Sequence, residues 1–357
     1  MNEREHGSQS SGPVFFERNR VFRVYTGGKL FGAFFGEEAA DGNFPEEWVA
    51  SSVRALNREP RGEREGVSRV RGTGEYFDLL LDRMREPMLG GRRSLDMLVK
   101  ILDSAIRLPV QAHPDKVFSR RHFGSEFGKT EAWIVLDTRE NAKIHFGFRD
   151  GVTREDFVSA FEKSAGDRSV MASLLNELPA RKGDVYLIHP GTVHAIGAGC
   201  LILEVQEPTD FTVQPEAWCG DHRLDEYEMF LGLERDQAFD CFDFSASGEA
   251  ALRRGMVKPR VLESTGSIRS EELIGYTDTP CFSVIRRRLR AGRIALRSAP
   301  CVVIVTEGSG VLRTEGGDRP VRKGDYFFIP HAARGLCGLE TAGELEAVEC
   351  IPPASAG

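Results

Sequence analysis

Two segments of this chain follow the same pattern, and that pattern is the strongest constraint on its fold. Residues 183–190 read Gly-Asp-Val-Tyr-Leu-Ile-His-Pro, and residues 324–330 read Gly-Asp-Tyr-Phe-Phe-Ile-Pro. In each segment a Gly-Asp turn leads into a short apolar run that ends at a proline, as expected for a buried β-strand. We interpret the pair as a degenerate internal repeat. The sequence therefore predicts two related β-barrels.

The chain beyond residue 250 strengthens this interpretation, because it consists mostly of short strand-like runs separated by turns. Such spacing is typical of an antiparallel sandwich or barrel. The predicted strands there cover 282–287, 302–306, 310–313 and 326–329. Nearer the N-terminus, residues 20–25 and 30–35 also read as β-rich pieces, and residues 75–85 read as a helix.

A helical insertion interrupts the first predicted barrel. Residues 153–178 have apolar side chains at helical spacing, and Thr153 with Asp156 is close to a capping box. We expect a flexible N-terminus (1–14), a catalytic domain (15–245) with a helical insertion near 153–180, and a C-terminal barrel domain (246–357) that lacks metal ligands. The predicted fold class is mainly β with a helical insertion.

Composition narrows the possible partners. The chain has 357 residues, enough for two or three domains, and its formal charge of −7 argues against general nucleic-acid binding. We expect neither a signal peptide nor a membrane span, because the N-terminus has no apolar core and no apolar run is long enough. The seven cysteines are scattered without a Cys-x-x-Cys pair. They predict reduced thiols in a cytoplasmic protein and no thiolate zinc site.

Three segments carry side chains that suit a metal ion. Gln111 and His113 are two residues apart in a strand-like context, so both leave the same face of a sheet. Glu131 opens an apolar run that reads as a strand, and His194 follows a Pro-Gly turn. Two imidazoles with two side-chain oxygens suit Zn²⁺, and a water or substrate could complete its coordination.

The segments around these residues resemble the cupins and, within them, the type I zinc-dependent mannose-6-phosphate isomerases in their short bacterial form. The resemblance rests on Val-Gln-Ala-His-Pro-Asp (110–115), Gly-Lys-Thr-Glu (128–131), Pro-Gly-Thr-Val-His-Ala-Ile-Gly (190–197) and Leu-Glu-Val-Gln-Glu-Pro-Thr-Asp (203–210). It covers most of residues 15–245 and extends more weakly to the C-terminus. It implies two cupin-type barrels, or jelly-roll sandwiches, of which the N-terminal one is catalytic.

The resemblance also implies an activity and a set of site residues. The activity is the interconversion of mannose 6-phosphate and fructose 6-phosphate through an enediol, with one Zn²⁺ per chain. The family's four zinc ligands fall on Gln111, His113, Glu131 and His194. Its acidic substrate-site residue falls on Glu204, and a lysine falls on Lys129.

Related enzymes have an active-site arginine in the stretch after Asp210, whereas this chain has Gln214 there. Glutamine supplies neither a positive charge nor a guanidinium fork. We expect Glu204, Lys129 and Gln214 at the catalytic centre, and Lys129, Glu204 and Asp210 on the substrate.

Some roles stay open at this level. Glu204 is the best candidate for proton transfer, because a partly desolvated carboxylate can be tuned toward neutral pH, but a water at the metal or Asp210 could share that role. Lys129 could meet the sugar phosphate or an enediolate oxygen. Arg120 and Arg121 either add to a phosphate pocket or are solvated loop charges.

Two other functions compete with the isomerase. One is a metal-bound sugar-phosphate-binding cupin with weak or no turnover, suggested by Gln214. The other is an iron-dependent cupin oxygenase, against which the extra glutamine ligand weighs. For the isomerase we expect a small-molecule sugar phosphate as the partner, no nucleic acid, no membrane, and a cytoplasmic monomer or homodimer.

Overall fold

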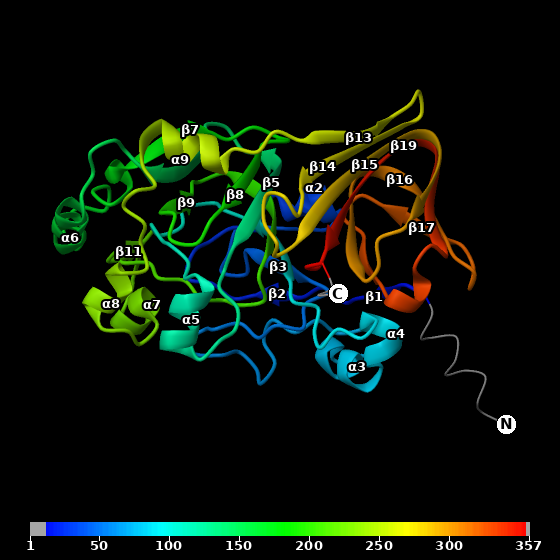
Figure 1. Ribbon diagram of the computed structural model, residues 1–357, viewed down its shortest axis with the longest axis horizontal. Helices are drawn as coiled ribbons and strands as arrows, with labels where there is room; N and C mark the ends of the chain where they lie inside the picture. Colours follow the sequence, from blue (N-terminus) through cyan, green and yellow to red (C-terminus); the bar gives the residue numbers. More distant parts are fainter. Residues whose placement is uncertain (1–11, 355–357) are drawn as a thin grey trace.

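The computed structural model describes residues 12–354, and β-strands outweigh helices in it (Figure 1). The strands are β1 (Val14–Phe15), β2 (Arg20–Val21), β3 (Glu46–Val49), β4 (Leu98–Asp103), β5 (Glu131–Thr138), β6 (Lys143–Phe148), β7 (Leu175–Pro179), β8 (Val185–Ile188), β9 (His194–Ile196), β10 (Cys200–Gln206), β11 (Trp218–Cys219), β12 (His222–Arg223), β13 (Arg260–Ser264), β14 (Ile268–Ile274), β15 (Ser283–Leu296), β16 (Cys301–Arg313), β17 (Arg319–Arg322), β18 (Tyr326–Ile329) and β19 (Cys337–Ile351). The helices are α2 (Phe31–Phe35), α3 (Phe77–Arg83), α4 (Arg85–Leu89), α5 (Lys116–Phe123), α6 (Arg154–Lys163), α7 (Glu226–Phe230), α8 (Arg235–Phe239) and α9 (Gly248–Gly255). The predicted mainly β fold is confirmed.

A six-stranded antiparallel sheet, in the order β2-β3-β4-β10-β5-β8, forms the centre of the N-terminal half. Successive side chains leave a strand on opposite faces. One face of this sheet therefore carries Leu102, Trp133 and Ile202 into the interior of the N-terminal barrel. The other face carries alternate residues such as Ile134 and Leu203 into a second core. A three-stranded sheet, β7-β6-β9, lies beside the first core.

The C-terminal half is an eight-stranded sheet that follows the order β1-β18-β16-β19-β15-β14-β13, with β17 paired to β16. Its apolar residues, including Val284 and Phe328, pack into the second core against the six-stranded sheet. The strand predicted at 326–329 is β18. The runs predicted at 302–306 and 310–313 belong to one strand, β16, whose register shifts between them.

The N-terminal segment joins this sheet. Val14 pairs with Phe328 in an antiparallel ladder, so β1 is an edge strand of the C-terminal sheet. Of the N-terminus predicted to be flexible, residues 1–11 lie outside the described part of the chain. The division into domains at residue 245 stays a prediction.

Two short elements correct the expectations. Within residues 30–35, predicted as a strand, Phe31–Phe35 forms helix α2: Phe31, Phe34 and Phe35 have helical spacing and are all buried, and Gly36 closes the helix at φ 68°. The predicted insertion begins as a helix, with Thr153 and Asp156 in a capping box. Its second half does not continue as one, because Leu175–Pro179 pairs with β6 as strand β7.

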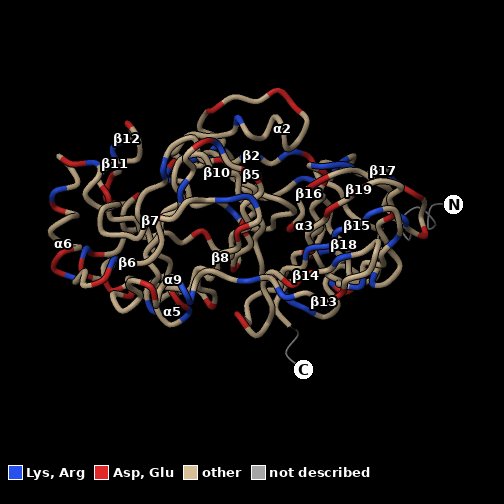
Figure 2. The backbone as a smooth tube through the Cα atoms, turned by 90° about the horizontal axis from the view of Figure 1, so that it is seen from above, with Lys and Arg blue, Asp and Glu red and all other residues tan. Residues whose placement is uncertain are grey.

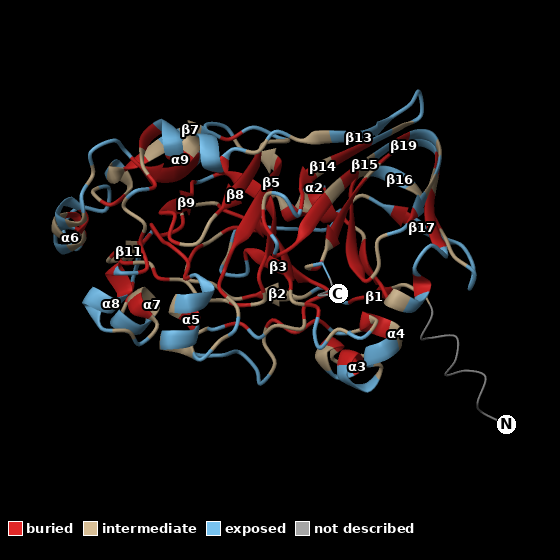
Figure 3. Ribbon diagram, viewed as in Figure 1, coloured by how far each residue is buried: buried red, intermediate tan, exposed pale blue. Residues whose placement is uncertain are grey.

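Burial is concentrated in the strands, and the helices cover the outside (Figure 3). Acidic and basic residues are interspersed over both halves of the molecule (Figure 2). All seven cysteines are buried and none forms a disulfide, in agreement with the sequence. Between residues 12 and 354 no helix has the length and apolar character needed to cross a bilayer.

Candidate metal centre and active-site pocket

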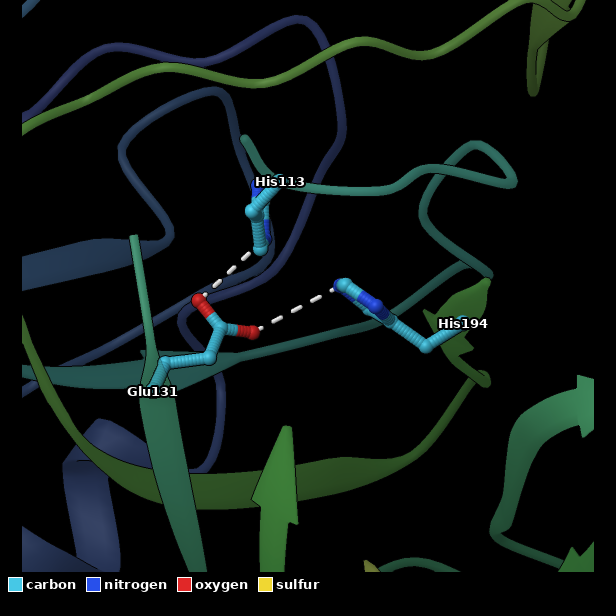
Figure 4. Close-up of side chains that lie close together, drawn as sticks. All are labelled: His113, Glu131 and His194. Atoms are coloured by element: carbon cyan, nitrogen blue, oxygen red, sulfur yellow. Dashed lines mark ion pairs between the residues drawn. The ribbon is translucent and has the colours of Figure 1, made fainter. Parts of the chain in front are cut away.

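His113, Glu131 and His194 come together in the first barrel (Figure 4). One ligand atom from each side chain lies within 4.8 Å of the other two, and all three residues are buried. The Glu131 carboxylate lies between the two rings, 3.2 Å from Nε2 of His113 and 3.5 Å from Nε2 of His194. Among the described residues this is the group of acidic, histidine or cysteine side chains that could hold a metal ion.

A hydrogen bond at Nδ1 of each histidine ring orients the ring so that its other nitrogen can bind a metal ion. Nδ1 of His113 lies 2.9 Å from the carbonyl oxygen of Phe211, and Nδ1 of His194 lies 2.8 Å from that of Thr192. A carbonyl only accepts, so Nδ1 of each neutral ring carries the proton and the Nε2 lone pair faces the centre. Nε2 of His194 is buried without a hydrogen-bond partner, and a metal ion would satisfy it.

The surroundings of the three side chains keep both histidines neutral and the glutamate ionised. Burial lowers the pKa of His194 to about 3 and also lowers that of His113. Burial opposes ionisation of Glu131, but Lys129 and His113 outweigh it and hold the pKa of this carboxyl well below its ordinary range. Two neutral imidazoles and a carboxylate are the forms that bind a divalent cation.

The backbone of Gln111 is hydrogen-bonded to the backbone of His194. Its N–H donates to the carbonyl oxygen of His194, and the N–H of His194 donates back, both at 2.9 Å. This bridge places Gln111 beside His194. Gln111 forms an isolated β-bridge with His194 and lines the same pocket as His113, and its role as a metal ligand stays a prediction.

A row of five side chains crosses the interior face of the six-stranded sheet. The strand registers pair Trp48 with Lys100, Lys100 with Glu204, Glu204 with Trp133, and Trp133 with Tyr186. Directly opposed residues point to the same face. Glu204 therefore lies one strand away from β5, the strand that carries Glu131.

Lys100 is the cation around which the pocket carboxylates gather. Its Nζ atom lies 3.3 Å from Glu204, 3.6 Å from Asp210 and 3.8 Å from Glu46. Burial opposes a charge on Lys100, but the carboxylates raise its pKa above the ordinary value. Sequence analysis missed this residue. A lysine inside the apolar run Leu98–Leu102 carries the same signal that identified Glu204.

Arg23 and Glu46 complete this network and were also missed. Arg23 donates to both oxygens of Asp210 at 3.0 and 3.1 Å, and its Nε lies 3.0 Å from Glu46. Glu46 also accepts from Tyr25 and Trp48. Asp210, predicted to touch the substrate, is thus held by the protein itself.

Glu204 is buried, and its surroundings disfavour ionisation. Burial, and next Glu131, raise its pKa to about 7, although Lys100 and Lys129 lower it. Nε1 of Trp133 donates to Glu204 at 3.2 Å. A carboxyl tuned near neutral pH can both accept and donate a proton.

Lys129 and Gln214 occupy different parts of the pocket. Nζ of Lys129 lies 3.0 Å from Nε2 of His113 and 3.1 Å from Glu131, so this lysine faces the centre. Gln214 lines the pocket, and its side-chain amide donates to the carbonyl oxygen of Glu228.

One pocket brings nearly all the predicted site residues together. It is lined by Gln111, His113, Lys129, Glu131, Glu204, Asp210 and Gln214, and by the missed residues Arg23, Glu46 and Lys100. His194 adjoins it through the metal-binding group. Arg120 and Arg121 do not line it; both lie in the last turn of α5, where Arg120 pairs with Glu126.

Comparison with known proteins gives a consistent result. No family model matches the chain. A mannose-6-phosphate isomerase from Streptococcus mutans is 27% identical over 342 residues, which cover 94% of this chain and 97% of that protein. The crystal structure of the mannose 6-phosphate isomerase from Bacillus subtilis is 25% identical, with a TM-score of 0.74 over 95% of this chain and 99% of that one.

A third protein is similar in fold. It is a mannose 6-phosphate isomerase bound with zinc and yttrium, 15% identical, with a TM-score of 0.67 over 95% of this chain and 99% of that one. The resemblance indicated by the sequence motifs is confirmed along nearly the whole chain. In sequence and in fold alike, the chain is a relative of the mannose-6-phosphate isomerases.

Proposed function

We propose that this chain is a zinc-dependent aldose–ketose isomerase that interconverts mannose 6-phosphate and fructose 6-phosphate through an enediol. The observation that carries the proposal is the placement of Glu204 in one pocket with the His113–Glu131–His194 group. A carboxyl group whose pKa is near neutral pH can transfer a proton, and a metal ion bound beside it would polarise the carbonyl group of the sugar. The similarity to proteins named for this reaction supports it.

The zinc ligands in this proposal are Gln111, His113, Glu131 and His194, with one ion per chain. A Zn²⁺ bound there supplies a Lewis acid that stabilises the charge developing on the sugar oxygen. The neutral amide of Gln111 keeps the ligand set at one negative charge. The structure of a similar protein with bound zinc supports this choice of metal.

Glu204 moves the proton between C1 and C2 of the sugar. As a carboxylate it removes the proton from one carbon, and as the acid it returns the proton to the other. Lys100, 3.3 Å away, stabilises the carboxylate form, and burial favours the acid form. This balance suits a group that changes protonation twice in each turnover.

The remaining site residues bind and orient the sugar. Lys129 offers an ammonium to an oxygen of the enediolate. Asp210, held by Arg23, positions Lys100 and presents an acceptor to a sugar hydroxyl. Glu204, Lys129 and Glu131 are buried at the inner end of the pocket, which limits contact of the enediol with bulk water.

The test combines metal content with two measurements on mannose 6-phosphate. We expect zinc to copurify with the chain, the C2 proton to exchange with solvent, and fructose 6-phosphate to form. Zinc with neither exchange nor product contradicts the isomerase and favours a sugar-phosphate-binding cupin. Iron together with oxygen consumption would favour an oxygenase.

A further inference from the structure

Four cations line the pocket, and three of them are bound to buried carboxylates. Lys129 lies 3.1 Å from Glu131, Lys100 contacts three carboxylates, and Arg23 is held by two. Removing Lys100 or Arg23 from its partners would leave uncompensated buried charge, which is strongly unfavourable, and Lys129 lies at the metal-binding group, where it faces the reacting oxygens of the sugar. They are poorly suited to bind a further dianion.

The fourth cation, Arg58, is different. Its side chain is 56% exposed, and its ion-pair partner, Asp225, is 41% exposed. Exposed ion pairs contribute little to stability, because water solvates both groups when they separate. Arg58 can therefore leave Asp225 for another anion at low cost.

Arg58 lies at the exposed end of the pocket. Leu56 and Arg58 come from one segment of the chain, and Tyr227 and Glu228 from helix α7, and all four line the pocket. Leu56 and Tyr227 are both exposed, so this end is the mouth of the pocket. The Arg58–Asp225 ion pair joins the two segments.

We propose that Arg58 binds the phosphate group of the substrate and releases Asp225 when it does so. A guanidinium fork matches two phosphate oxygens, and this geometry gives the strongest ionic hydrogen bonds. The inference rests on the proposed function for the identity of the substrate. It also explains how the pocket can function with glutamine at position 214: Arg58, which lines the same pocket, supplies a guanidinium.

Asp225 keeps its structural role when Arg58 leaves. Its Oδ1 atom accepts from the N–H of Glu228 and caps helix α7, whereas Arg58 contacts Oδ2. Glu228, the acidic residue of α7 that lines the pocket, lies 3.1 Å from His222 and accepts from the N–H of Asp225. The exchange therefore requires no rearrangement of the helix.

The test compares three variants of the zinc-loaded chain by calorimetric titration with mannose 6-phosphate. Arg58→Ala should weaken binding about 10- to 100-fold, the usual range for losing hydrogen bonds to a charged group. Asp225→Asn, which keeps an N-cap residue, should strengthen binding, because it removes the competing anion. Arg83→Ala removes an equally exposed arginine on α3 and should match the parent chain.

Opposite effects of the two site variants separate this role from a structural one, since a merely structural ion pair would give losses in both. Neutral mannose should bind all variants equally. Binding of mannose 6-phosphate within twofold of the parent in Arg58→Ala would overturn the proposal. A parent chain that binds mannose 6-phosphate without isomerising it contradicts the proposed function alone, and the binding comparison still tests Arg58.

Discussion

Nζ of Lys129 lies 3.0 Å from Nε2 of His113, so an ammonium group contacts the imidazole nitrogen that faces the metal-binding group. The same ammonium lies 3.1 Å from the Glu131 carboxylate. Lys129 is thus the cation that balances Glu131 where no divalent ion does so. Lysine and metal compete electrostatically for the same donor atoms.

Lys129→Met should destabilise the metal-free protein and have a smaller effect on the zinc-loaded protein. Without zinc, Glu131 would be left as an unpaired buried charge, and breaking such a pair costs about 3–5 kcal/mol. Zinc supplies the missing positive charge. Thermal unfolding with EDTA and with added zinc measures both states. Lys143→Met, which removes an exposed lysine paired with Glu177, serves as the control; equal destabilisation of Lys129→Met in both conditions would contradict this account.

His194→Ala should abolish zinc retention, whereas Gln111→Ala should only weaken it. His194 offers a buried, unpartnered nitrogen, and a neutral amide oxygen binds zinc less strongly than imidazole. Zinc content after dialysis against a chelator of known affinity ranks the variants. Retention of zinc by His194→Ala equal to that of the parent chain would remove this residue from the ligand set.

Glu204→Gln should lower the rate of proton exchange at C2 by about 10²- to 10⁴-fold, the usual contribution of a general base, and leave zinc content unchanged. Glutamine keeps the shape and can still accept from Trp133. Glu249→Gln, which changes an exposed side chain on helix α9, is the matched control. Exchange at the parental rate in Glu204→Gln would assign the proton transfer elsewhere, with Asp210 as the next residue to test.

Gln214→Arg should change kcat/KM for mannose 6-phosphate less than about threefold in the parent chain, because one bidentate guanidinium satisfies the phosphate and Arg58 supplies it. The same substitution should raise kcat/KM when Arg58 has been replaced by alanine. Steady-state kinetics of the four combinations measures the coupling. A large gain from Gln214→Arg in the parent chain would show that the pocket lacks a guanidinium.

His145 predicts a pH dependence that metal does not affect. Burial, and next Arg107, lower its pKa to about 4, against an ordinary value of 6.5. Between these values the unfolded chain takes up a proton that the folded chain refuses, so stability falls as the pH falls through this window. His145→Gln should remove up to about 1.4 kcal/mol of this loss per pH unit. Urea titrations of both proteins in EDTA, from pH 7 to pH 4.5, give the comparison; parallel curves would contradict it.

The chemistry of the site was largely accessible from the sequence. Gln111 and His113 are two residues apart, and this spacing predicts that their side chains share one face of a strand. Glu204 and Lys100 each place a charge within an apolar strand, where a charge needs a partner. The repeated Gly-Asp turn marks strands β8 and β18 in the same way. These are local signals, because backbone geometry alone sets the alternation of side chains along a strand.

Only the tertiary structure decided which of these side chains meet. Strand register places Lys100 opposite Glu204, and no periodicity encodes register between strands that are about a hundred residues apart. Likewise, no local pattern shows that Arg58 and Asp225, on separate loops, form an ion pair. In Leu175–Pro179, pairing with β6 makes the segment a strand although its apolar residues have helical spacing. The sequence alone singled out His113, Glu131 and His194, which the structure brings together. Folding decided their neighbours, because contacts between distant segments depend on packing of the whole chain.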